Sequence, residues 1–110
     1  MPPEHYDAIV VGAGHNGLVT AGYLAKAGLR TLVLERRGRA GGLLATEEIV
    51  PGVRAPVAAD GVGRLSAEVV RDLGLGLHGF RVLEPNVVAF GPSAEGASLT
   101  LWRDPVRTAM

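Results

Sequence analysis

Two different spacings of apolar residues organise the first third of the chain. Residues 6–11 form an apolar run rich in β-branched side chains, which is typical of a buried strand. Residues 18–27 then follow helical spacing, and one face of that helix is predicted to comprise Leu18, Ala21, Leu24 and Ala25. Gly28 predicts the end of the helix, and residues 30–34 form a second strand-like run. The order of strand, helix and strand predicts a βαβ unit with parallel strands.

The last third of the chain is predicted to be rich in β-structure. Residues 80–84 and 87–90 are strand candidates, and residues 98–103 alternate as a half-buried strand does. Turn-forming residues separate the last two runs, so a hairpin is predicted across residues 87–103. Trp102 lies at strand spacing and is expected in a core or an interface rather than against a ligand.

Two short helices are predicted from their capping residues. Ser66 predicts the N-cap of a helix over residues 67–73, and Gly74 predicts its end. Asp104 followed by Pro105 predicts a further helix start near the end of the sequence. Together with the βαβ unit, these elements place the chain in the α/β class.

A glycine-rich turn joins the first strand to the helix, and residues 12–17 read GAGHNG. Gly12 permits a tight turn off the strand, Gly14 lets a pyrophosphate approach the backbone, and Gly17 lets the helix pack closely on the strand. The first amides of a helix have no partner within it, and the helix dipole adds positive potential there. The turn is therefore predicted to bind the pyrophosphate of a dinucleotide.

The context of this glycine pattern matters more than the pattern itself. Glycine makes up 16 of the 110 residues, so G-x-G-x-x-G is expected by chance roughly 0.3 times in such a chain. A second match, at residues 74–79, follows a helical stretch and is interpreted as a helix stop plus a loop. The first match has an acid, Glu35, at the end of the second strand, where a carboxylate accepts hydrogen bonds from a ribose hydroxyl and repels a 2′-phosphate.

Several polar residues near the turn have alternative interpretations. Asn16 either contacts the bound phosphates or caps the first helical turn, and both interpretations stay open. For His15 the capping role is favoured, because one histidine without a partner acid or base defines no catalytic group. Arg37 fits a solvated loop. The adjacent glycines Gly41 and Gly42 permit positive φ and a close approach of backbone to ligand.

Composition excludes several classes of function. The 11 basic residues balance the 11 acidic residues, which gives no electrostatic argument for binding nucleic acid or membranes. The absence of cysteine excludes disulfides, thiolate catalysis and Cys-based metal sites. The first seven residues do not resemble a signal peptide, and the apolar runs are too short to span a bilayer. We therefore expect a soluble, cytoplasmic protein.

Four segments, in this order and spacing, resemble the N-terminus of the phytoene desaturase-like flavoproteins. They are residues 12–19, 34–37, 39–42 and 46–48. That family belongs with the FAD-dependent oxidoreductases of the amine-oxidase and carotenoid-desaturase type. The resemblance implies that the cofactor is FAD rather than NAD, that Glu35 holds the adenosine ribose and that residues 39–42 lie along the cofactor.

The site expected on these grounds binds a cofactor and has no assigned catalytic residue. Its cofactor-binding residues are expected to be Gly12, Ala13, Gly14, Asn16, Gly17, Glu35, Arg36, Gly41 and Gly42. The sequence contains no recognisable constellation of acid, base and nucleophile, and no metal ligands are assigned. One segment departs from the family: residues 55–63 read APVAADGVG where the family has an Asp-x-Gly segment with aromatic or histidine neighbours, and we interpret them as a flexible loop.

The expected organisation is a partial FAD/NAD(P)-binding domain over residues 1–110. Residues 6–50 form the Rossmann-like βαβ unit with the glycine turn and the Gly-Gly loop. Residues 51–110 supply a loop, a short helix and a β-hairpin that lead toward a missing substrate domain. A parallel sheet needs both faces covered, and only one crossover helix is predicted. Exposed apolar surface is therefore expected to bind that missing domain or another copy of the chain.

The expected function is the N-terminal FAD-binding portion of a flavin-dependent oxidoreductase of the desaturase or dehydrogenase kind. In such enzymes the flavin takes a hydride or electrons from the substrate, and the protein supplies binding and orientation. We expect this chain to be inactive alone. The alternatives are a non-catalytic module for nucleotide binding or assembly, and an NAD-binding Rossmann unit, which is favoured if Gly41 and Gly42 form only a loop.

Overall fold

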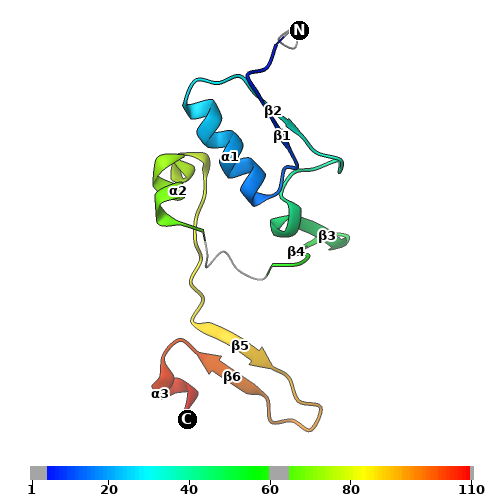
Figure 1. Ribbon diagram of the computed structural model, residues 1–110. Coiled ribbons are helices and arrows are strands. Elements are labelled where there is room, and N and C mark those ends of the chain that lie inside the picture. Colours follow the sequence, from blue (N-terminus) through cyan, green and yellow to red (C-terminus); the bar gives the residue numbers. More distant parts are fainter. Residues whose placement is uncertain (1–4, 60–64, 110) are drawn as a thin grey trace. The chain divides into compact units, whose positions relative to one another are not determined.

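The computed structural model describes residues 5–59 and 65–109, which form parts of two compact units (Figure 1). The first unit, Met1–Phe80, contains β1 (Ala8–Val11), α1 (His15–Lys26), β2 (Thr31–Leu34), η1 (Gly42–Leu44), β3 (Thr46–Val50), β4 (Val53–Pro56), α2 (Ala67–Asp72) and η2 (Leu75–His78). The second unit, Arg81–Met110, contains β5 (Val87–Gly91), β6 (Leu99–Trp102) and α3 (Pro105–Thr108). Helices and strands are thus mixed, as predicted for an α/β chain.

The predicted βαβ unit is confirmed. β1 and β2 pair in parallel, from Ala8 opposite Thr31 to Val11 opposite Leu34. α1 is the crossover that parallel neighbours require, and it lies alongside both strands (Figure 1). The helix ends in a Schellman motif: the Gly28 N–H donates to Ala25 O at 2.9 Å, and the Leu29 N–H donates to Leu24 O at 3.1 Å.

The packing of α1 differs in part from its predicted apolar face. The helix begins at His15, earlier than the predicted residue 18, so Gly17 lies inside its first turn. Ala21 is buried and Leu24 is half-buried, as expected, but Leu18 and Ala25 are exposed. Small residues bring the helix close to its neighbours: a Cβ added at Gly22 would lie 3.0 Å from Leu73 Cδ1.

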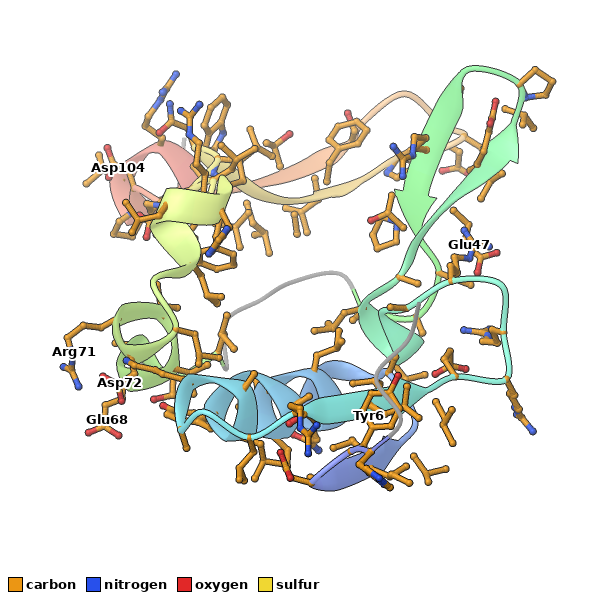
Figure 2. The ribbon with its side chains drawn as sticks, turned by 90° about the horizontal axis from the view of Figure 1, so that it is seen from above. Tyr6, Glu47, Glu68, Arg71, Asp72 and Asp104 are labelled. Carbon is orange, nitrogen blue, oxygen red and sulfur yellow. The ribbon has the colours of Figure 1, made fainter. Side chains whose placement is uncertain are left out.

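The helix α2 docks against the C-terminal half of α1. The Tyr23 hydroxyl donates to Asp72 Oδ2 at 3.0 Å, and Lys26 Nζ donates to the Asp72 carbonyl; Asp72 is labelled in Figure 2. The predicted caps of α2 are confirmed, since Ser66 Oγ accepts from the Glu68 N–H at 3.2 Å and Gly74 ends the helix with φ +61°. The second glycine pattern forms η2, so its interpretation as a helix stop plus a loop is confirmed.

A short antiparallel hairpin of β3 and β4 was not predicted from the sequence. Pro51 and Gly52 form its two-residue turn between Val50 and Val53, which are paired. Gly52 has φ +81°, and proline followed by such a glycine is typical of a type II turn. Glu48 Oε1 also accepts from the Gly52 N–H at 2.7 Å, which stabilises the turn.

In the second unit, the predicted hairpin and the helix start are confirmed. β5 and β6 pair antiparallel, and Asp104, labelled in Figure 2, caps α3 by accepting from the Val106 N–H at 2.9 Å. Trp102 is half-buried, and the Arg107 guanidinium lies 4.1 Å from the centre of its ring. The strand predicted at residues 80–84 is wrong, because these residues pair with no strand in the part of the chain that the structure describes.

One face of the β1–β2 sheet remains exposed within the described residues. Val10 faces α1 and is half-buried, whereas Ile9, Val11 and Leu34 are exposed, and Val11 keeps 83% of its surface accessible. Of the loop predicted over residues 55–63, residues 60–63 lie outside the described residues, and β4 includes residues 55 and 56. No described helix has the length and apolar character needed to cross a membrane.

Candidate functional site

The glycine turn leads directly from β1 into α1. The Gly12 N–H donates to Leu34 O at 2.7 Å, which continues the parallel pairing, and Gly12 then turns the chain with φ +98°. Gly14 is the helix N-cap in an extended conformation, and its carbonyl accepts from the Leu18 N–H at 2.9 Å. The turn is therefore a strand end and a helix start at once, which is the arrangement that the motif requires.

The N-terminus of α1 offers free backbone donors. Among the described residues, no side chain makes a cap hydrogen bond at Gly14, so the first helical amides keep their unpaired N–H groups. The interpretation that His15 and Asn16 cap this turn is wrong, because both lie inside the helix and Gly14 is the cap. Both side chains are exposed, and Asn16 belongs to the first helical turn, whose backbone N–H groups are unpaired. Such a helix start attracts anions.

Gly17 fulfils a steric requirement in the first turn of the helix. A Cβ at this position would overlap the carbonyl oxygen of Gly12 and would also lie 3.4 Å from Val10 Cγ1. Real Cβ atoms do not approach a backbone oxygen so closely, so only glycine permits this contact between helix and strand. The packing role predicted for the third glycine of the motif is therefore present in the structure.

The second glycine pair lies directly on the first turn. The Gly41 N–H donates to Ala13 O at 2.8 Å, and Gly14 and Gly41 form an isolated parallel bridge. A Cβ added at Gly42 would lie 2.9 Å from Gly14 Cα. Gly41 and Gly42 both have positive φ, at +121° and +57°. Two backbone segments without side chains thus lie in contact at the start of α1.

Glu35 is fixed at the edge of the same turn. Its Oε2 accepts from the Ala13 N–H at 2.7 Å, and its Oε1 accepts from the Arg37 N–H at 3.0 Å. The Arg37 amide and then the Ala13 amide lower the pKa of the Glu35 carboxyl from its ordinary value, so the group is ionised at neutral pH. Each carboxylate oxygen has a further lone pair with which to accept from a ligand hydroxyl.

Beyond Glu35, Arg37 of the following loop and Glu47 of β3 add charged groups that the sequence analysis did not assign to the cofactor site. Arg36 is exposed. Arg37, Gly38, Arg39 and Glu47 line an open hollow. Arg39 Nη2 lies 2.8 Å from Glu47 Oε1, and Glu47 is labelled in Figure 2. The sequence contains no local signal for this ion pair, because its members belong to different elements.

The structure therefore brings together the glycine turn, Glu35 and the Gly41–Gly42 segment, whereas Arg36 is adjacent to Glu35 in the sequence and is exposed. Residues 12–17 form the turn and the helix start, Glu35 and Arg36 follow β2, and Gly41 and Gly42 return to the turn. Among the residues that the structure describes, no cluster of three or more His, Cys, Asp or Glu side chains could hold a metal ion. The chemistry that this arrangement supports is the binding of an anion next to a hydrogen-bonding carboxylate.

Comparison with known proteins gives related chains of much greater length. The rat protein named pyridine nucleotide-disulfide oxidoreductase domain-containing protein 2 is 43% identical over 100 residues, covering 91% of this chain and 17% of the relative. One of the subunits of limonene dehydrogenase from Castellaniella defragrans is 43% identical over 99 residues, covering 89% and 18%. Thioredoxin reductase of Aquifex aeolicus is 37% identical over 76 residues, covering 67% and 24%.

The chain thus spans less than a fifth of the length of the first two of these relatives. Across the chain itself, the family described as an NAD(P)-binding Rossmann-like domain matches residues 10–90. That range contains the glycine turn, α1, Glu35 and the Gly41–Gly42 segment. Both the geometry and the match lead to one assignment: the chain belongs to the family of NAD(P)-binding Rossmann-like domains.

Proposed function

We propose that this chain binds FAD and is the N-terminal FAD-binding portion of a flavin-dependent oxidoreductase, of the phytoene desaturase-like kind. The observation that carries the proposal is the hydrogen bond from the Ala13 N–H to the Glu35 carboxylate, at 2.7 Å. It joins the acid that would hold a ribose to the turn that would hold a pyrophosphate. The proposed contacts are Gly12, Ala13, Gly14, Asn16, Gly17, Glu35, Arg36, Gly41 and Gly42.

The residues present fit the ADP half of such a cofactor. Free amides at the start of α1 are suitable donors to a pyrophosphate, and the helix dipole adds positive potential. The ionised Glu35 accepts from ribose hydroxyls and repels a 2′-phosphate, which disfavours NADP. A side chain at position 42 would fill the space next to Gly14, so the bare backbone there keeps the cradle open.

The choice of FAD over NAD rests on the second glycine pair. Gly41 and Gly42 extend the backbone surface around the turn, which suits a bulky dinucleotide whose far half continues past the pyrophosphate. When bound, a flavin supplies hydride or electron transfer, and this chain's residues bind and orient it. Two of the relatives are named as a reductase and as part of a dehydrogenase, and both names agree with redox chemistry.

We also propose that this chain is a partial FAD/NAD(P)-binding domain that functions with further protein. Residues 6–50 supply the βαβ unit and the Gly-Gly loop, and residues 51–110 lead toward a substrate domain. The proposal is supported by the exposed face of Ile9, Val11 and Leu34, and by the greater length of the relatives. The exposed face also favours a second candidate function, an assembly or nucleotide-binding module that pairs with another copy.

A titration of the purified 110-residue chain tests the proposed function. FAD, NAD and ADP-ribose are each added, and binding is measured by calorimetry together with the visible spectrum of any flavin that co-purifies. Flavin absorbance that is released on denaturation, or FAD binding tighter than NAD binding, supports the proposal. A colourless chain that binds ADP-ribose and NAD as tightly as FAD supports a nucleotide-binding module instead. A chain that binds none of the three overturns both FAD binding and nucleotide binding and favours the assembly role.

The variant Glu35→Arg tests the role of the carboxylate in the same assay. The change removes the acceptor for the ribose and the partner of the Ala13 amide, so we expect at least a tenfold loss of FAD affinity, which corresponds to about 1.4 kcal/mol. An arginine there no longer repels a 2′-phosphate, so the preference against NADP is expected to weaken. Unchanged FAD affinity in this variant contradicts the assignment of Glu35.

A further inference from the structure

The Gly41–Gly42 segment contacts the turn, but its own backbone is intrinsically flexible. Two adjacent glycines have more conformational freedom in the unfolded loop than any other pair, so holding them in one geometry has a high entropic cost. In the structure, Gly41 donates to Ala13 O and is followed by η1, where the Leu44 N–H donates to Gly41 O at 3.0 Å. A further contact in the loop that precedes them would reduce this freedom.

That contact is the ion pair between Arg39 and Glu47. Arg39 Nη2 lies 2.8 Å from Glu47 Oε1, and Arg39 Nη1 donates to Thr46 O at 3.4 Å. A single guanidinium therefore ties the loop to both a side chain and the backbone of β3. The two residues flank the segment that contains Gly41, Gly42 and η1, so the ion pair closes this segment into a ring.

A buried residue within this segment packs against the glycine pair. Ala45 is buried, and a Cβ added at Gly41 would lie 3.1 Å from Ala45 Cα. The Ala45 N–H also donates to Gly42 O at 3.3 Å. Glu47 lies in β3, two residues after Ala45. Its position is thus coupled through a short stretch of backbone to the contact between the glycine pair and Gly14.

We propose that Arg39 and Glu47 are a positioning pair for the cofactor site, and that their ion pair holds the Gly41–Gly42 backbone against Gly14. This inference rests on the proposed binding of FAD at the turn. The pair touches no cofactor atom in this proposal and acts through the backbone of the loop. Its members are partly exposed, with 48% and 28% of their side-chain surfaces accessible, so its effect on binding is expected to be moderate.

The sign of one substitution separates this role from direct contact with the cofactor. Glu47→Gln removes a negative charge close to an anion site, so simple electrostatics predicts tighter binding of FAD. A positioning role predicts the opposite, since the freed Arg39 no longer restrains the loop. We expect Glu47→Gln and Arg39→Gln each to weaken FAD binding about two- to fivefold, the range open to an exposed ion pair.

The experiment is a double-mutant cycle on the full chain, with FAD affinity as the readout at low and high salt. Arg39→Gln/Glu47→Gln is expected to bind no more weakly than either single variant, and Arg39→Lys is expected to recover part of the loss. Added salt should shrink the difference between wild type and the single variants. Glu84→Gln, which breaks an exposed ion pair with Arg103 in the second unit, is the matched control and should leave FAD affinity unchanged.

A second readout needs no cofactor: the hydrogen-exchange rate of the Gly41 amide, which donates to Ala13 O. We expect faster exchange at Gly41 in Glu47→Gln than in wild type, with the amides of β1 unaffected. If wild type binds FAD and Glu47→Gln binds it equally well or more tightly, the positioning role of the pair is overturned and the proposed function stays intact. Failure of wild type to bind FAD overturns the proposed function, and equal Gly41 exchange in both proteins then overturns the pair as well.

Discussion

At the scale of single residues, Gly17 carries the strictest steric requirement of the site. A Cβ added at Gly17 would overlap the Gly12 carbonyl oxygen, so no side chain fits, whereas no described atom lies within 4 Å of a Cβ added at Gly12 or Gly76. The glycines of the motif are therefore required for different reasons. Gly12 adopts a positive φ, and Gly17 leaves room for the Gly12 carbonyl, which a Cβ would overlap. The sequence predicts both roles, because strand, turn and helix follow each other without a gap.

Gly17→Ala is expected to force the helix start away from β1. The strain of inserting a methyl group into a closed contact costs about 1–3 kcal/mol, and the displaced amides should weaken FAD binding at least tenfold. Chemical denaturation and FAD titration measure the two effects. Gly76→Ala is the matched control because its Cβ meets open space, and equal stability of the two variants contradicts the steric argument.

The pH dependence of stability is expected to include a contribution from Glu35. Its folded pKa is lowered by the Arg37 and Ala13 amides, so its stabilising effect is fully present above the unfolded pKa, about 4.3, and is lost as pH falls through the lower folded value. Glu35→Gln removes this contribution. Thermal melts should therefore show wild type more stable than the variant at pH 7, with a difference that shrinks below about pH 4.3. A difference that does not depend on pH contradicts this assignment.

Residue-scale prediction fails where a partner comes from another element. The spacing of the motif predicted that Glu35 lies at the turn, because β1 and β2 are neighbours in every βαβ unit of this kind. The Arg39–Glu47 pair depends instead on the path of an irregular loop and on a hairpin that was not predicted. No periodicity in the sequence encodes such a contact.

At the scale of elements, local signals predicted the helices better than the strands. Caps and stops at Ser66, Gly74 and Asp104 act within a few residues, so they can be recognised without knowledge of the fold. Strands need a partner to form. Residues 80–84 have strand-like composition, yet no described strand pairs with them, whereas β3 gains a partner through the turn at Gly52.

Gly28→Ala tests the end of α1, the element that presents the binding amides. Gly28 has φ +87°, and no described atom lies within 4 Å of an added Cβ, so the cost is conformational and not steric. We expect a loss of about 1 kcal/mol, or roughly 4–8 °C in Tm for a domain of this size. Gly28→Asn should lose less, because asparagine tolerates this conformation; equal losses contradict the explanation.

At the scale of the whole molecule, the described residues bury little apolar surface. Only Ala13, Ala21 and Ala45 are buried hydrophobic residues there, and all three have small side chains. The parallel sheet has α1 on one face and an exposed apolar strip on the other. A sequence can predict that such a sheet needs two covered faces, but it cannot identify what covers the second.

Val11→Thr tests whether the strip of Ile9, Val11 and Leu34 drives association. The side chain of Val11 is 83% exposed, so a change to the similarly shaped threonine should affect stability little while it makes the strip more polar. We expect wild type to associate as concentration rises and the variant to associate less, measured by analytical ultracentrifugation. Val88→Thr changes an exposed strand valine of the second unit and is the control. A wild type that stays monomeric contradicts the prediction.

The anchoring of Glu35 has a consequence for how a ligand arrives. Its carboxylate is held by two backbone amides, one on each oxygen, before any nucleotide is present. The side chain therefore has little rotational freedom left to lose, and association avoids the penalty of about 0.5–1.5 kcal/mol for immobilising such a group. Recognition of the sugar should accordingly proceed as rigid docking in a single kinetic phase, without a preceding rearrangement of the acid.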